Sequence, residues 1–195
     1  MGAQKMEAGD RARAFTLIEL LIVVAIIAIL AAIAVPNFLE AQVRSKVSRV
    51  YSDMRSLILA METYKLDTNQ YPPDGGFDEM YSWAFLTTPI AYITSVPLDA
   101  FNNQYPSGSR GPSKYYPYTY YAYPDTGPGS QYGAGYLIFG VGPNKRDDFV
   151  DFPNYSIDLV GQGPEAIADM LYDASNGTIS YGDIVVTRKG IYNRM

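Results

Sequence analysis

The chain has 195 residues, with 15 basic and 20 acidic side chains and a net charge of -5. Cysteine and histidine are both absent, which excludes disulfides, thiolate or histidine metal ligands, a cysteine nucleophile and a Ser-His-Asp triad. The negative charge is the wrong sign for a surface that gathers nucleic-acid phosphates. The composition therefore disfavours both an enzyme and a nucleic-acid-binding protein.

The chain begins with polar residues 1–14, which carry three basic side chains, followed by an apolar run of 21 residues, 15–35. As a helix that rises about 1.5 Å per residue, this run covers about 30 Å, the thickness of a bilayer's hydrocarbon layer. The basic flank comes first, so the positive-inside rule places the N-terminus in the cytoplasm and the rest outside. A cleavable signal peptide is the alternative, since the small residues of 28–34 could mimic its cleavage site, although its apolar core is only about 7 to 15 residues long.

Glu19 is the charged residue within this apolar run. A carboxylate inside a bilayer costs about 2.5 to 3.5 kcal/mol or more, and the sequence shows no partner beside it. Either Glu19 reaches the headgroups or is protonated, or another molecule supplies a positive charge. Cleavage between Ala14 and Phe15 would create an α-amine at Phe15 that Glu19 of a neighbouring subunit could bind. The cost of burying Glu19 would then favour assembly.

The segment RAFTLIELLIVVAIIAILAAIAVPNF resembles the class III signal and first helix of type IV pilins and type II secretion pseudopilins. The resemblance covers the basic leader, the Phe, the Glu four residues later, the apolar helix and the proline after it. It implies that a prepilin peptidase cuts between Ala14 and Phe15 and N-methylates Phe15. Two features depart from the family: Ala14 replaces the usual Gly, and Ala28 lies about where a helix-loosening Gly is often found. Pro36 is left as the expected weak point of the helix.

Residues 36–67 are predicted to continue the helix with one apolar face. Apolar side chains recur at spacings of three and four along it: Val43, Val47, Val50, Met54, Leu57, Met61 and Tyr64. This spacing is typical of an amphipathic helix, and we expect the face to pack on the protein's own domain. The helix should end near Lys65, because the prolines and glycines of 72–76 cannot continue it.

Residues 68–195 are expected to form a globular head. A short helix is predicted within 77–89, stopped by Pro89, and a packed extended segment or loop over 91–101. Its anchors are Tyr92, Ile93, Val96 and Phe101.

The strands of the head are predicted from alternation and β-branched runs. The tyrosine-rich segment that begins at 115 suits a half-buried strand with Pro117 at an edge, 135–142 a central strand, and 182–188 the last one. We expect an α+β fold in which a three- or four-stranded antiparallel sheet lies on the amphipathic half of the helix. The tyrosines could instead form an adhesive or carbohydrate-stacking surface.

The loops of the head resemble those of the major pseudopilins, in which a calcium ion stabilises the corresponding region. Calcium prefers six to eight oxygen ligands, and the first candidates here are Asp147, Asp148 and Asp183. Further oxygen-bearing side chains nearby are Asn144, Asp151, Asp173 and Asn176. Their spacing does not match an EF-hand, and solvated turns are the alternative explanation. Calcium is the one cofactor that the resemblance suggests.

The resemblance implies a structural subunit rather than an enzyme. The expected function is that of a major pseudopilin, which polymerises through its N-terminal helix into a type II secretion pseudopilus. Its partners would be its own copies, the prepilin peptidase, an assembly platform and ATPase, minor pseudopilins and an outer-membrane secretin. The chain would span the inner membrane once, with its head in the periplasm. The alternatives are a pilin of a surface filament for adhesion, motility or DNA uptake, and a membrane-anchored binding module.

Overall fold

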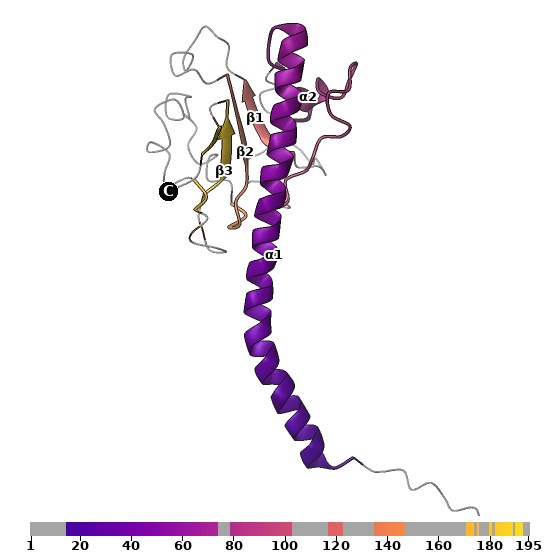
Figure 1. Cartoon of the computed structure of the whole chain (residues 1–195), viewed down its shortest axis with the longest axis vertical. Helices are drawn as coiled ribbons and strands as arrows, with labels where there is room; N and C mark the ends of the chain where they lie inside the picture. The colour runs from indigo at the N-terminus through magenta and orange to yellow at the C-terminus, as the bar shows by residue number, and fades with distance from the viewer. Residues whose placement is uncertain are drawn as a thin grey trace, which may run out of the picture. The chain divides into compact units, whose positions relative to one another are not determined.

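A computed structural model describes residues 15–73, 79–102, 117–122, 135–146, 171–173, 175, 180, 182–188 and 190–192. The chain forms two compact units, Met1–Leu39 and Glu40–Met195. The first described element is the helix α1 (Leu17–Thr68), whose residues contribute to both units. Figure 1 shows α1 together with the labelled elements α2, β1, β2 and β3.

The 52-residue helix α1 runs on through Pro36 and ends at Thr68, three residues past the expected Lys65. Its C-terminus is closed by Asn69, whose φ of 59° is left-handed and whose N–H donates to the Lys65 carbonyl at 2.8 Å. This is the αL type of helix cap, for which Asn is one of the favoured residues, and prolines commonly follow it. Pro72 and Pro73 come directly after the cap region. The helix therefore ends by a local signal in the sequence.

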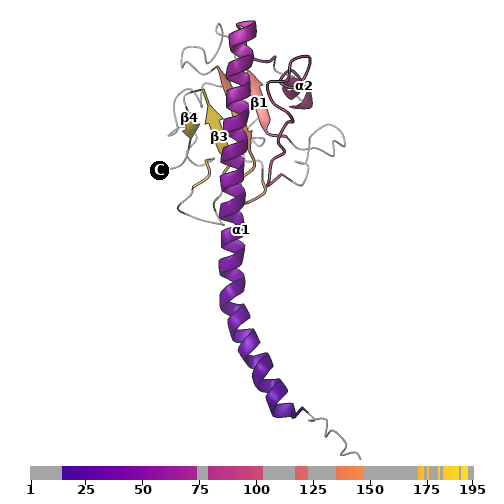
Figure 2. The ribbon, with the colours of Figure 1, turned by 45° about the vertical axis from the view of Figure 1, so that its right-hand side comes forward.

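The core of the second unit lies between α1 and the sheet. From α1 it takes one buried face of Val47, Val50, Met54, Leu57, Ala60 and Met61. Val43 and Tyr64 are partly buried against the same cluster. Figure 2 shows this stretch of α1 passing across the sheet. The expectation that the apolar face packs on the protein's own domain is confirmed.

The sheet has four antiparallel strands in the order β1-β2-β3-β4. Their bounds are β1 (Thr119–Ala122), β2 (Tyr136–Gly140), β3 (Ile184–Thr187) and β4 (Gly190–Tyr192). Tyr120 pairs with Ile138 across β1 and β2, and Ile138 pairs with Val186 across β2 and β3. The predicted α+β fold with a small antiparallel sheet is confirmed.

The predicted last strand, 182–188, is not the last one. β3 covers its centre, and the chain turns at Arg188 and pairs a further strand, β4, against it. With three residues, β4 is too short to show alternation, and pairing with β3 gives it its strand conformation. β1 begins two residues after Pro117, which forms an isolated bridge with Leu98.

The short helix α2 (Glu79–Ala84) lies within the predicted range but ends five residues before Pro89. The N–H groups of Thr87 and Thr88 donate to the Ala84 carbonyl, so the chain leaves the helix in turns. Trp83 is buried, and its indole N–H donates to the Tyr118 carbonyl at 2.7 Å. This bond fixes α2 to the residue that precedes β1.

Candidate functional site

The first turn of α1 is closed by Thr16 and Glu19. The Glu19 carboxylate accepts hydrogen bonds from the Thr16 N–H at 2.9 Å and from the Thr16 hydroxyl at 2.7 Å. The Glu19 N–H donates in turn to the Thr16 Oγ1 at 3.2 Å. This reciprocal pattern is a capping box, which satisfies N–H groups that have no partner inside the helix.

The capping box corrects the expectation that Glu19 has no partner nearby in the sequence. Threonine followed three positions later by glutamate, at the start of an apolar run, is the signature of this motif. Thr16 is therefore a residue of the candidate site that the analysis of Glu19 as an isolated charge missed. Its two hydrogen bonds fix the Glu19 side chain along the first helical turn.

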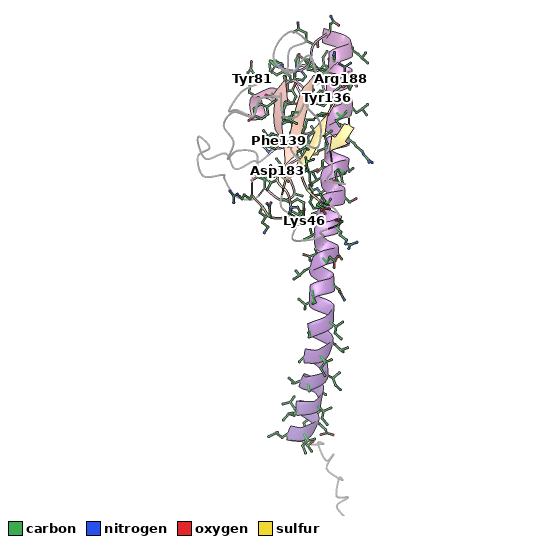
Figure 3. The ribbon with its side chains drawn as sticks, turned by 90° about the vertical axis from the view of Figure 1, so that its left-hand side faces the viewer. Lys46, Tyr81, Tyr136, Phe139, Asp183 and Arg188 are labelled. Carbon is green, nitrogen blue, oxygen red and sulfur yellow. The ribbon has the colours of Figure 1, made fainter. Side chains whose placement is uncertain are left out.

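The helical segment 17–39 is apolar on all sides, and every one of its residues is exposed. Figure 3 shows these side chains projecting from the helix in all directions. The segment is long and apolar enough to cross a membrane, and none of its residues is buried in the structure. A helix that is hydrophobic all round needs lipid or other protein around it.

Three further predicted residues lie at or near this segment. Ala14 falls outside the described residues, and Phe15 is the first described residue, with 75% of its surface exposed. Pro36 lies inside the continuous helix α1. Cleavage between Ala14 and Phe15 and a role for Pro36 in assembly stay predictions.

The predicted calcium ligands divide between described and undescribed residues. Asp147 and Asp148 lie outside the described part, whereas Asp183 is fully buried at the start of β3. Its carbonyl accepts the Tyr172 N–H at 2.9 Å, and Figure 3 labels its position beside the sheet. Among the residues that the structure describes, no group of three Asp, Glu, His or Cys side chains could hold a metal ion.

The loop that leads to Asp147 starts beside Asp183. Gly142 lies so close to the backbone of Gly182 that a Cβ at position 142 would overlap the Gly182 carbonyl. Asn144 lies in this loop, and its side-chain oxygen accepts the Arg146 N–H at 3.1 Å. The structure thus places Gly142, at the start of the loop that leads to Asp147, in backbone contact with Gly182, the residue before Asp183.

Asp99 is a buried acidic residue that the sequence analysis did not single out. Its Oδ1 accepts the Phe101 N–H at 2.9 Å and its Oδ2 accepts the Val141 N–H at 2.7 Å. The carboxylate therefore joins the loop of 98–101 to the end of β2. Such hydrogen bonds to a charged acceptor are roughly twice as strong as those between neutral groups.

Several tyrosines in the described part of the head are core residues or hydrogen-bond donors to α1. Three hydroxyls donate to carboxylates of α1: Tyr118 to Asp53 at 3.1 Å, Tyr71 to Glu62 at 3.0 Å and Tyr92 to Asp67 at 3.0 Å. Tyr118, Tyr120 and Tyr136 are almost completely buried. Burial, together with the negative charges of Asp99 and Asp53, raises the pKa of Tyr118 well above its usual value. These buried residues pack the sheet against α1 and are not available as a stacking surface.

Two families match the chain. Residues 9–35 match the family described as "Prokaryotic N-terminal methylation motif". Residues 37–135, about half of the chain, match the family described as "Type II secretion system (T2SS), protein G". The first match ends at Val35, directly before Pro36, and the second covers the rest of α1 and the first half of the head.

Relatives of both kinds are found among characterised proteins. The type II secretion system core protein G of Escherichia coli is 34% identical over 107 residues, which cover 51% of this chain and 74% of that protein. A type IV wide pilus major component of Thermus thermophilus is 39% identical over 94 residues, 48% of this chain and 70% of that protein.

A type IV major pilin of Myxococcus xanthus is 51% identical over a shorter stretch of 61 residues, 31% of this chain and 28% of that protein. No solved structure gives a significant match. The match to the protein G family over half of the chain, and the identity with the core protein of E. coli over most of that protein's length, agree with each other. The chain therefore belongs to the type II secretion system protein G family.

Proposed function

We propose that this chain is the major subunit of a type II secretion pseudopilus, a structural protein that polymerises through its N-terminal helix. The observation that carries the proposal is the exposed segment 17–39, because it is apolar on all sides and begins with a fixed carboxylate. In a filament, copies of this segment would cover one another and remove that apolar surface from water. Membership of the protein G family supports this function over other filament roles.

Processing would prepare the same end of the helix for assembly. A cut between Ala14 and Phe15 would create a new α-amine on Phe15, two residues before the helix begins at Leu17. The capping box already aims the Glu19 carboxylate back toward this end. The carboxylate has further lone pairs, so it can bind the amine of a neighbouring Phe15 while it caps its own helix. We infer that the Thr16–Glu19 pair presents the charge and the neighbour's amine neutralises it.

The test compares two replacements of Glu19 in cells that carry the secretion machinery. Glu19→Ala removes both the cap and the charge, whereas Glu19→Gln keeps a capping-box side chain and removes the charge. Charge pairing predicts that both variants insert into the membrane and that both lose sedimentable filaments. Filaments from Glu19→Gln at the level of the unmodified chain would refute charge pairing and leave capping as the role of Glu19. Membrane fractionation of each variant controls for insertion.

A surface type IV pilin is the second candidate. It is supported by the similarity to the pilins of Thermus thermophilus, over 94 residues, and of Myxococcus xanthus, over 61 residues. Neighbouring genes for a secretin and a secretion ATPase would favour the pseudopilus. A retraction ATPase and motility genes in their place would favour the pilus.

The remaining parts of the proposal concern location and partners. We place the head in the periplasm, because the basic residues precede the membrane segment. A prepilin peptidase, an assembly platform with its ATPase, minor pseudopilins and a secretin are the proposed partners. No nucleic-acid partner is proposed, since the chain is acidic.

We also propose that the head binds calcium near Asp183. The contact between Gly142 and Gly182 supports this, because it starts the loop of Asp147 and Asp148 beside that buried carboxylate. Carboxylate and carbonyl oxygens suit calcium, which would hold these loops together when bound.

A further inference from the structure

Basic side chains gather on the part of α1 that directly follows the apolar segment 17–39. Residues 40–55 contain four basic and two acidic side chains, whereas residues 56–102 contain one basic and six acidic side chains. We call the first three of these basic residues the basic collar: Arg44, Lys46 and Arg49. The collar is exposed, and the side chains of Arg44 and Arg49 keep 72% and 66% of their surface. The part of α1 next to the apolar segment is therefore positive, although the whole chain is acidic.

The collar lies near the height of lipid headgroups when residues 17–39 cross a membrane. Its members follow Leu39 by five, seven and ten residues, which places their Cα atoms about 8 to 15 Å beyond it along the helix. The headgroup layer extends about 5 to 8 Å beyond the hydrocarbon on each side. In a helix every Cα–Cβ bond tilts toward the N-terminus, so the long basic side chains lean back toward the membrane and cover the remaining distance. The collar can therefore donate to lipid phosphates.

Lys46 connects the collar to the core of the second unit. Its Nζ lies 5.7 Å from the centre of the Phe101 ring, and Phe101 is buried. The Phe101 N–H donates to Asp99, which also accepts an N–H at the end of β2. Figure 3 labels Lys46 at the end of this unit where α1 enters it, and Arg188 toward the opposite end. A surface that binds the collar therefore also orients the sheet.

The ion pairs of the collar leave it able to bind a further anion. Arg44 pairs with Glu40 and Arg49 with Asp53, in both cases across one turn of α1. The Arg49–Asp53 distance is 3.6 Å, which is too long for a hydrogen bond. Exposed pairs of this kind contribute little to stability, and each guanidinium has five N–H donors. Phosphates can therefore bind beside these carboxylates or displace them.

We propose that the basic collar binds the headgroups of anionic phospholipids on the side of the membrane that carries the head. The inference rests on the proposed function, in which residues 17–39 span the membrane before assembly. Charge and position identify the ligand, because a membrane presents phosphates near the height of the collar. The same surface repels the acidic residues of 56–102, so the two charged regions together orient the second unit. The contact holds the subunit in this orientation until it joins a filament.

The absence of cysteine from the chain allows the contact to be measured by protection of a thiol. Ser45→Cys places a reporter between Arg44 and Lys46 in the full chain. The protein is reconstituted at a low protein-to-lipid ratio into vesicles of phosphatidylcholine, without or with about one third phosphatidylglycerol. An uncharged polyethylene glycol maleimide is then added from outside.

We expect the reporter to be labelled about fivefold more slowly in the vesicles with phosphatidylglycerol, because each basic residue near an anionic surface favours contact by about that factor. The rate should recover in about 1 M salt, which screens the surface charge. Thr63→Cys is the control for position. It is exposed and lies 18 residues further along α1 than Ser45, about 27 Å, so its labelling rate should be the same in both lipids.

Two charge variants separate contact from a general effect of the surface. Arg44→Gln with Arg49→Gln removes two collar charges and should bring the labelling rates of Ser45→Cys in the two lipids within about twofold of each other. The matched control, Arg55→Gln with Arg188→Gln, removes the same charge from two exposed arginines outside the collar and should leave the difference unchanged. A negative surface that acted on the thiol alone would slow the collar variant further, because loss of the arginines disfavours the reactive thiolate. Both variants should keep the unfolding midpoint of the detergent-solubilised chain, since all four side chains are exposed.

The outcomes separate this inference from the proposed function. Slower labelling that requires phosphatidylglycerol, the collar arginines and low salt supports it. Equal rates in the two lipids, or a difference that persists in the collar variant, overturn it. Protection in both lipids that grows with protein concentration shows a second copy at the collar and also overturns it. None of these results affects filament formation by the unmodified chain, which tests the proposed function. If the full chain is extracted from the vesicles at alkaline pH, it does not span them, and both the inference and the proposed function are refuted.

Discussion

Asp99 should be one of the most sensitive polar positions of the head. Its two oxygens accept N–H groups from Phe101 and Val141, and the side chain is 7% exposed. Asp99→Ala leaves both donors buried without an acceptor, and each such group costs about 1 to 3 kcal/mol. We therefore expect Asp99→Ala to lower the free energy of unfolding by about 2 to 6 kcal/mol. Asp99→Asn keeps one acceptor oxygen and should cost about half as much.

The assay is urea unfolding of the detergent-solubilised full chain, followed by tryptophan fluorescence. Trp83 is the single tryptophan and is buried beside Tyr118, so its emission reports on the head. Asp67→Asn is the matched control: Asp67 is exposed and accepts one hydroxyl, from Tyr92, and its loss should cost about 0.5 kcal/mol or less. If Asp99→Ala unfolds within about 0.5 kcal/mol of the unmodified chain, the assigned role of this carboxylate is wrong.

Three further perturbations have clear expected results. Burial, as the main cause, raises the pKa of Tyr118 above its usual value of 10.0. The folded state therefore favours the neutral phenol, and the contribution of Tyr118 to the free energy of unfolding is fully present below about pH 10 and is lost as the pH rises above it. Tyr118→Phe should reduce this loss of stability at alkaline pH, measured as the fall of the urea midpoint from pH 8 to 11 in steps of about one unit. The same fall of the midpoint in the variant and in the unmodified chain would contradict the prediction. Gly135→Ala places a Cβ 2.5 Å from the Tyr71 ring, and should cost about 1 to 3 kcal/mol in the same unfolding assay; a neutral result would show that Tyr71 moves aside freely. Chelation of calcium should lower the melting temperature of the head. Identical melting temperatures with and without calcium would refute the proposed calcium site.

Much of the molecule is specified by local patterns that can be seen in the sequence alone. The bilayer-length apolar run and the three-four spacing from Val43 to Tyr64 predict the two parts of α1, because a helical face depends only on the order of side chains. The capping box of Thr16 and Glu19 is equally local and could have been found by its spacing. β2 is a short run of apolar residues and was predicted close to its observed bounds.

Other features depend on segments that are far apart in the chain. β4 is a strand because it pairs with β3, since three residues carry no period of their own. Asp99 can be placed only when the loop of 98–101 meets the end of β2, 42 residues away along the chain. The role of the tyrosines also cannot be predicted from the sequence alone, because a tyrosine-rich segment fits a core as well as a binding surface. Packing against α1 assigns Tyr118 and Tyr136 to the core, by burying both and by giving Tyr118 a carboxylate of that helix as its hydrogen-bond acceptor.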